Sequence, residues 1–69
     1  MSQINATQLE TACRMFAELK AIPASHAGRL IRLLERGNDE ALLLVYRNKI
    51  KFCWMIARRI LMQRGVELA

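Results

Sequence analysis

The stretch that decides the fold is Asp39–Arg64, DEALLLVYRNKIKFCWMIARRILMQR, which holds most of the large apolar residues and most of the positive charge. Its residues tolerate a helix throughout. One helix over these 26 residues would be about 39 Å long at ~1.5 Å per residue, whereas a globule of this size is only ~28 Å across. We therefore expect the helix either to break near Asn48, whose side chain competes for backbone hydrogen bonds, or to protrude and pair with a second copy.

Two shorter helices are expected before this stretch. The first follows a polar start, where Thr7 and Glu10 have the spacing of a capping box, and Pro23 ends it. The second has Ser25 as its N-cap and Gly37 as a left-handed C-cap. The sequence thus predicts an all-α fold, a single domain over 1–69 built as a small bundle of three to four helices, at about 6–21, 26–36 and 39–64.

The composition indicates a protein that associates with a second copy of itself or with another protein. The chain has 69 residues, of which 54% are hydrophobic, above the usual ~45–50% that includes glycine. So short a chain has little interior in which to bury its apolar side chains. This favours a homodimer or a permanent complex with another protein. The polar amino terminus predicts no signal peptide, and no apolar run is long enough to span a membrane. Cys13 and Cys53 are expected to be free, buried thiols in a reducing cytoplasm.

The last helix carries apolar residues on two sides. One stripe is wide enough to pack against the first two helices; it comprises Tyr46, Ile50, Cys53, Trp54, Ala57, Ile60 and Leu61. A second set lies opposite, with Phe52, Met55, Arg59 and Met62 spaced as a seam and Leu44 about two turns before Phe52. Methionines suit adaptable interfaces, and an aromatic residue near an arginine suits a binding hot spot. We expect this second face to bind another protein or to close the homodimer.

The basic residues offer an alternative. The net charge of +5 resides in residues 29–69, where nine basic residues face four acidic ones. A basic segment of this kind can bind the phosphates of nucleic acid with weak sequence specificity, or it can dock on an acidic protein. The candidates for contact with nucleic acid are Arg47, Lys49, Lys51, Arg58 and Arg59.

The sequence shows no catalytic, cofactor or metal signature. It has one histidine, two separated cysteines and no pair of carboxylates apart from Asp39 and Glu40, which suit a helix start. There is no glycine-rich phosphate loop and no zinc-ligand spacing. We expect a protein that is not an enzyme, with no cofactor, no metal and no small-molecule substrate.

Residues 45–53, VYRNKIKFC, resemble part of the carboxyl-terminal motif of a family of short regulators. These are the negative regulators of AraC-type transcription factors of enteric bacteria and phages, whose motif runs W-x-x-x-R-x-x-F-C. Lys49 falls where the family has arginine, Phe52 and Cys53 match, and Val45 replaces the tryptophan. The resemblance implies a small helical protein that binds a transcription factor.

From these observations we expect a small, cytoplasmic, non-enzymatic regulatory or adaptor protein that binds and modulates another protein through a helix face. The resemblance makes a transcriptional regulator the expected partner. A small basic nucleic-acid-binding regulator is the first alternative, and a subunit of a structural assembly is the second.

Overall fold

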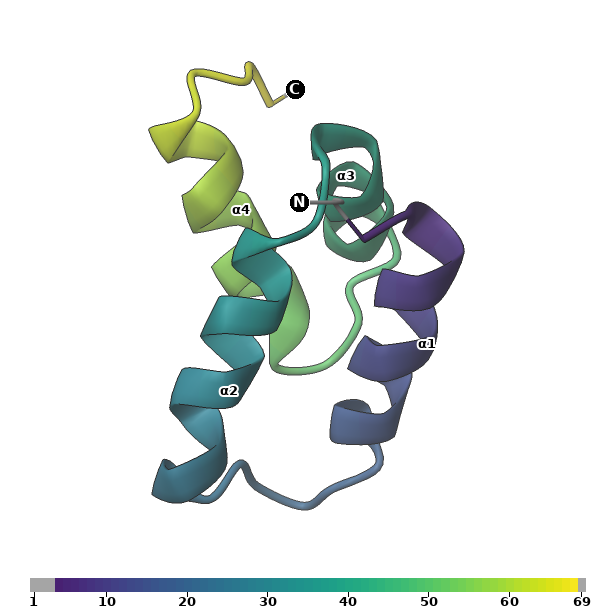
Figure 1. The fold of residues 1–69 in the computed structure, drawn as a ribbon, viewed down its shortest axis with the longest axis vertical. Coiled ribbons are helices and arrows are strands. Elements are labelled where there is room, and N and C mark those ends of the chain that lie inside the picture. Colours follow the sequence, from purple (N-terminus) through teal and green to yellow (C-terminus); the bar gives the residue numbers. More distant parts are fainter. Residues whose placement is uncertain (1–3, 69) are drawn as a thin grey trace.

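A computed structural model describes residues 4–68 of the chain (Figure 1). The fold is all-α, as expected, and within the described residues the only β pairing is an isolated bridge between Ile4 and Gly37. The molecule measures 30 × 28 × 19 Å. Its helices are α1 (Ala6–Ala17), α2 (Ala24–Glu35), α3 (Asp39–Arg47) and α4 (Cys53–Gln63).

The long carboxyl-terminal stretch is broken at Asn48, which confirms the expectation from its length. The Asn48 N–H closes α3 by donating to the Leu44 carbonyl oxygen at 3.0 Å. The chain then turns through Lys49 and Phe52, whose φ angles of 51° and 69° lie in the left-handed region. Between them the buried Ile50 anchors the connection, and its carbonyl oxygen accepts the first hydrogen bonds of α4. As a result α4 folds back and packs against α3.

The first helix begins where expected but is capped by different residues. Asn5 Oδ1 accepts a hydrogen bond from the Gln8 N–H at 2.9 Å, and Gln8 Oε1 accepts one from the Asn5 N–H at 3.3 Å. The prediction of a Thr7–Glu10 capping box is therefore wrong, because Thr7 already lies inside the helix. Glu10 instead pairs with Arg14 one turn later, at 2.8 Å.

The end of α1 and the start of α2 also differ from the prediction. α1 ends at Ala17 instead of near residue 21, and the chain that follows brings Ile22 back against the core. Pro23, not Ser25, is the N-cap of α2. Its φ of −60° suits the approach to a helix, and its carbonyl oxygen accepts from the amides of residues 26 and 27.

Gly37 was expected to end α2 in a left-handed conformation, and this is wrong. α2 ends at Glu35, and Gly37 lies buried beside the amino-terminal segment, where the Ile4 N–H donates to the Arg36 carbonyl oxygen at 2.9 Å. A Cβ atom on Gly37 would lie 2.7 Å from Leu9 Cδ2. Any larger residue here would have to displace the buried Leu9 side chain.

Arg64, directly after α4, joins that helix to the junction between α2 and α3. Its Nη1 donates to the Gly37 carbonyl oxygen and to Asp39 Oδ1, both at 2.9 Å. Its Nη2 donates to the Glu35 carbonyl oxygen, also at 2.9 Å. One guanidinium group thus satisfies acceptors at the end of α2 and the start of α3. Asn38 caps α3, because its Oδ1 accepts from the Ala41 N–H at 2.7 Å.

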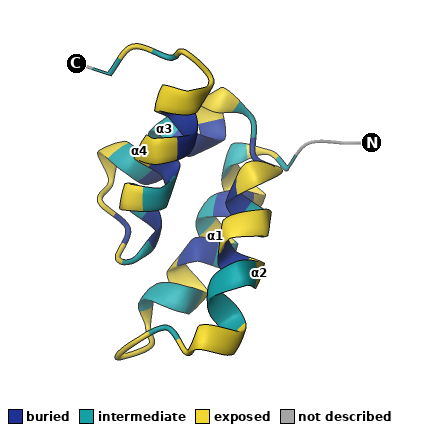
Figure 2. Ribbon diagram, turned by 90° about the vertical axis from the view of Figure 1, so that its left-hand side faces the viewer, coloured by how far each residue is buried: buried dark blue, intermediate teal, exposed yellow. Residues whose placement is uncertain are grey.

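The core draws on all four helices and on the connection before α4 (Figure 2). One expected core position is corrected, because Trp54 is only half-buried. Ile31, on α2, is 42% exposed. Cys13 and Cys53 are free and fully buried, and Cys53 Sγ donates to the Cys13 carbonyl oxygen at 3.8 Å. The buried residues are Leu9, Cys13, Leu30, Leu34, Ala41, Leu42, Val45, Ile50, Cys53, Ala57, Ile60 and Leu61.

Among residues 4–68, no helix combines the length and the apolar character that crossing a bilayer requires.

Candidate functional site

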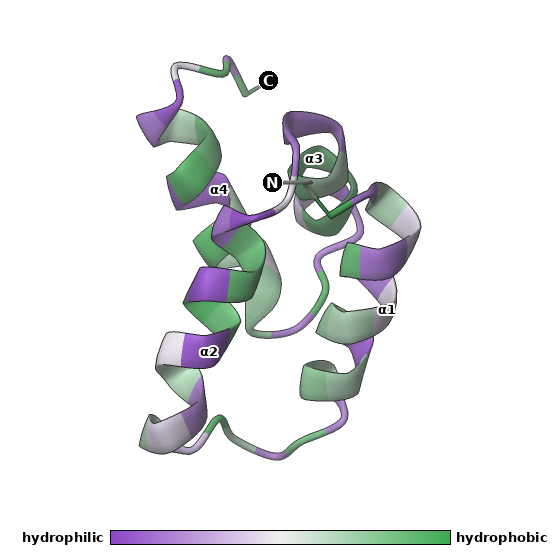
Figure 3. Cartoon of the chain, viewed as in Figure 1, coloured by the Kyte–Doolittle hydropathy of each residue, from purple (hydrophilic) through white to green (hydrophobic). Residues whose placement is uncertain are grey.

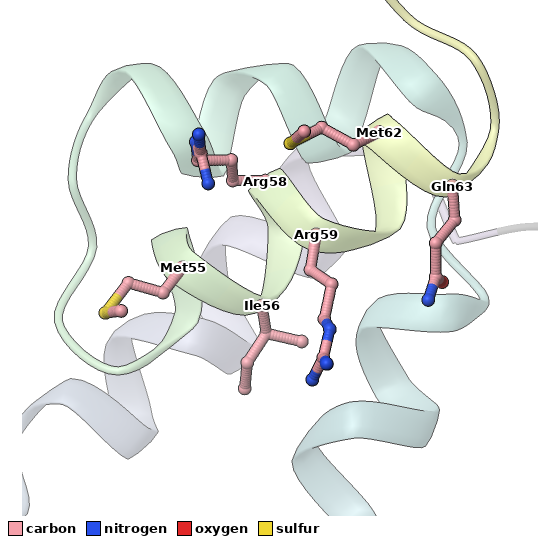
Figure 4. Close-up of a pocket in the computed structure, with 6 residues that line it drawn as sticks. All are labelled: Met55, Ile56, Arg58, Arg59, Met62 and Gln63. Carbon is pink, nitrogen blue, oxygen red and sulfur yellow. The ribbon is translucent and has the colours of Figure 1, made fainter.

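The outer face of α4 forms a shallow, open groove (Figure 4). Met55 and Met62 are 63% and 55% exposed, although each would contribute to stability if it were buried. They lie seven residues, or about two turns, apart, so both project from one side of the helix. We call this surface the α4 face. It is lined by Met55, Ile56, Arg58, Arg59, Met62 and Gln63.

Along this face the two arginines lie between the two methionines in the sequence. In Figure 3 apolar and strongly polar segments follow one another along α4. Arg58 and Arg59 are exposed, and neither forms an ion pair with any residue that the structure describes. The nearest carboxylate along the chain is that of Glu67, which lines a neighbouring hollow together with Arg58 and Met62. The face therefore combines apolar contact area with an excess of positive charge.

The structure brings together only part of the predicted partner-binding set. Met55, Arg59 and Met62 line the α4 face, whereas Phe52 and Leu44 do not. Phe52 precedes the helix in a left-handed conformation and packs, half-buried, against the core. The predicted seam assumed a helix that already included Phe52, and its φ of 69° takes the side chain out of that periodicity.

Leu44 lies on α3 and is half-buried. Three residues of the face were not predicted as partner contacts, namely Ile56, Arg58 and Gln63. The signal that identifies them is the helical spacing counted from Met55, once α4 is known to begin at Cys53.

The five basic candidates for contact with nucleic acid lie on α3, on α4 and in the connection between them, and both Lys49 and Arg58 lie beside Trp54. Arg58 and Arg59 belong to the α4 face, and Arg47 ends α3. Lys49 and Lys51 lie in the connection between α3 and α4, where Lys51 Nζ donates to the Leu19 carbonyl oxygen at 3.4 Å and lies 4.9 Å from the centre of the Phe52 ring. Lys51 is thus engaged in tying this connection to the end of α1.

Lys49 takes part in a second arrangement, which we call the aromatic corner: Tyr46, Lys49 and Trp54. Lys49 Nζ lies 4.2 Å from the centre of the Trp54 ring and 5.2 Å from that of Tyr46. The two ring centres are 6.4 Å apart, and the ring planes are inclined by 43°. These distances are those of cation–π contacts and of an aromatic pair.

A further hollow lies where α1 ends and α2 begins. It is lined by Met15, Phe16, Leu19, His26 and Arg29, and Met15 is 68% exposed. Nothing in the sequence singled out these residues as a site.

The part of the chain that the structure describes holds no cluster of metal-ligating side chains. No three histidine, cysteine or acidic side chains there come close enough to hold a metal ion. The contact of Cys13 with the Cys53 side chain, together with burial, raises the pKa of the Cys13 thiol above its ordinary value of 9.0. A thiol so protonated and enclosed is a poor nucleophile.

Comparison with known proteins identifies no relative: no family model, no curated protein and no solved structure matches this chain.

Proposed function

We propose that this protein is a small, non-enzymatic regulatory or adaptor protein that binds another protein through the α4 face. The observation that carries the proposal is the pairing of two exposed methionines with two arginines that have no carboxylate partner among residues 4–68. Methionine adapts to the shape of a partner, and arginine is enriched at binding hot spots. Burial of each methionine in a complex contributes on the order of 1.5–3 kcal/mol.

The occupant that fits this face is an amphipathic helix with acidic residues beside its apolar stripe. A helix of this kind places apolar residues against Met55 and Met62, two turns apart, in the manner of helix-in-groove recognition. Carboxylates beside that stripe complement Arg58 and Arg59. The complementary charge also raises the rate of encounter.

A second copy of the chain fits the same face less well. Arg58 is the central residue of α4, so antiparallel pairing of two α4 helices places the Arg58 side chains of both copies beside the symmetry axis. At ~8 Å and an effective dielectric constant of ~20, each arginine pair costs about 2 kcal/mol. That repulsion offsets part of the gain from burying Met55 and Met62 of both copies. The homodimer expected from composition stays a prediction.

Two finer parts of the proposal depend on the sequence. A transcriptional regulator as the partner follows from the resemblance of residues 45–53, and location in the cytoplasm fits the two free thiols. In the structure those residues end α3, form the connection and begin α4, so Phe52 and Cys53 contribute to the core. Mutating Phe52 would therefore disturb the fold, and it is a poor probe of binding.

The proposal is tested by capture with matched variants. Immobilised wild-type protein, Met55→Ala/Met62→Ala and Met15→Ala are incubated with a nuclease-treated extract of the cells that make the protein, and retained proteins are identified by mass spectrometry. Met15 is as exposed as the two methionines of the face but lies on α1. We expect wild type and Met15→Ala to retain the same partner and the double variant to lose it, with unchanged circular dichroism. Retention of that partner by the folded double variant contradicts the proposal.

A further inference from the structure

Trp54 is the only tryptophan of the chain, and it does not serve the core. It lies at the second position of α4, half-buried, and within residues 4–68 it is not among the apolar side chains that pack against the buried cluster. Tyr46, at the end of α3, is its aromatic neighbour. An aromatic pair at the surface is typical of a site that binds a flat or apolar group.

The backbone of the connection holds Lys49 over this pair. Lys49 has a φ of 51°, a conformation that residues other than glycine seldom adopt. The resulting turn brings Lys49 Nζ to 4.2 Å from the Trp54 ring centre and 5.2 Å from that of Tyr46. A strained backbone at a surface site points to a functional arrangement. The ammonium group occupies the ring face that a ligand would use, and since the side chain is long and exposed, it can move aside.

The charge around the aromatic corner is positive. Arg47 and Lys49 are exposed and lack a carboxylate partner within the described residues, and the sequence carries no acidic residue from 41 to 66. Lys51 is less available because it donates to the Leu19 carbonyl oxygen. An aromatic platform beside unpaired cations is the combination with which proteins bind single-stranded nucleic acid.

We propose that the aromatic corner binds single-stranded nucleic acid, with one base stacked on Trp54 and the adjacent phosphates held by Lys49 and Arg47. On binding, the base replaces the Lys49 ammonium group over the indole ring, and the released ammonium group pairs with a phosphate. Single strands fit because their bases are exposed for stacking, whereas those of a duplex are already stacked. This function goes beyond the proposed protein binding and rests on Trp54, Lys49 and Arg47. The two sites adjoin, because Met55 and Arg58 of the α4 face line a hollow with Trp54.

The experiment is a fluorescence titration with a ten-nucleotide oligothymidylate, in which Trp54 is the only tryptophan reporter. We expect stacking to quench the emission, and the logarithm of the affinity to fall with the logarithm of the salt concentration with a slope of about −1.4, that is about −0.7 for each of two phosphates. Binding without quenching overturns the proposal. So does equal affinity for inorganic polyphosphate, which has no bases, or stronger binding of a duplex of the same length.

Variants separate stacking from charge, with binding followed by the anisotropy of a labelled oligothymidylate. Trp54→Leu weakens binding about tenfold or more, and Trp54→Phe, which keeps an aromatic face, restores part of it. Lys49→Glu weakens binding more than Arg32→Glu, which makes the same charge change on the exposed side of α2. Circular dichroism establishes that each variant is folded.

Equal affinities for Trp54→Leu and wild type overturn the proposal. So does quenching of Trp54 by an acidic amphipathic peptide when the oligonucleotide produces none, because the corner would then belong to the protein-binding surface. Met62→Ala changes the α4 face outside the hollow that Trp54 shares with Met55 and Arg58, and it is expected to bind the oligonucleotide like wild type. Loss of oligonucleotide binding in Met62→Ala, when it is folded, would likewise move the site to the α4 face.

Discussion

Replacing Arg64 with alanine removes the link between the end of α4 and the junction of α2 and α3. The guanidinium group donates to the carbonyl oxygens of Glu35 and Gly37 and to Asp39 Oδ1, each at 2.9 Å. Alanine leaves all three acceptors without this donor. We expect a folded but less stable protein, because the core itself is unchanged.

The burial of each acceptor determines how much stability is lost with its hydrogen bond. The bond to the Gly37 carbonyl oxygen is partly buried, and Gly37 itself is buried, so water replaces the donor poorly there. Its loss costs about 1.5 kcal/mol. The bonds to Glu35 and Asp39 are exposed, and each contributes only ~0.3 kcal/mol. The sum is about 2 kcal/mol, which for a domain of this size lowers Tm by about 8–16 °C.

Thermal unfolding followed by circular dichroism measures this, with two comparison variants. Arg64→Lys keeps the charge but cannot reach three acceptors, and we expect it to lose about half as much stability as Arg64→Ala. Asp39→Asn removes only the exposed ion pair and some favourable charge at the start of α3, and it costs below ~1 kcal/mol. A Tm of Arg64→Ala within about 2 °C of wild type refutes the reasoning. So does an equal loss in Asp39→Asn, since the ion pair would then outweigh the carbonyl contacts.

Three further outcomes follow from the packing. Gly37→Ala lowers the free energy of unfolding by about 1–3 kcal/mol, because its Cβ would meet the fully buried Leu9 at 2.7 Å. Gly28→Ala has no neighbour nearer than 3.8 Å and raises the free energy of unfolding by about 0.5–1 kcal/mol. Chemical denaturation measures both changes, and the same sign for the two variants would contradict this interpretation. Iodoacetamide labels Cys13 and Cys53 only after unfolding, and rapid labelling of the native protein would show that the thiols are not enclosed. Contact with Cys53 and burial raise the pKa of the Cys13 thiol. The stability that this thiol contributes is therefore complete below the ordinary thiol pKa of 9.0 and declines at higher pH. The decline should be smaller in Cys13→Ala, and an identical pH profile of stability in this variant and wild type would refute the raised pKa.

The sequence predicted the architecture because length and helical periodicity are local properties. The break at Asn48 followed from comparing the length of one helix with the diameter of the globule. Gly37 was misjudged because its role depends on Leu9, which reaches it only in the folded molecule. The left-handed backbone conformation of Lys49 and Phe52 could not be predicted from the local sequence, since neither residue type favours it.

The candidate site was predictable to the extent that it lies on one helix. Met55, Arg59 and Met62 fall on one face by spacing alone, and the structure places them together. Phe52 was assigned to the same seam because the start of α4 was unknown. Trp54 was assigned to the core by periodicity, but the buried residues of α4 are Cys53, Ala57, Ile60 and Leu61, and Trp54 lies half-buried beside Tyr46.

The most direct test of the α4 face is photo-crosslinking from a single position. A benzophenone side chain replaces Met62 in one variant and Met15 in another, and both are irradiated in the cells that make the protein. We predict a nuclease-resistant crosslink to a different protein from position 62 and none from position 15. Equal crosslinking from both positions contradicts the account, and so does a product from position 62 at only twice the chain mass of 7.9 kDa, since the α4 face would then bind a second copy.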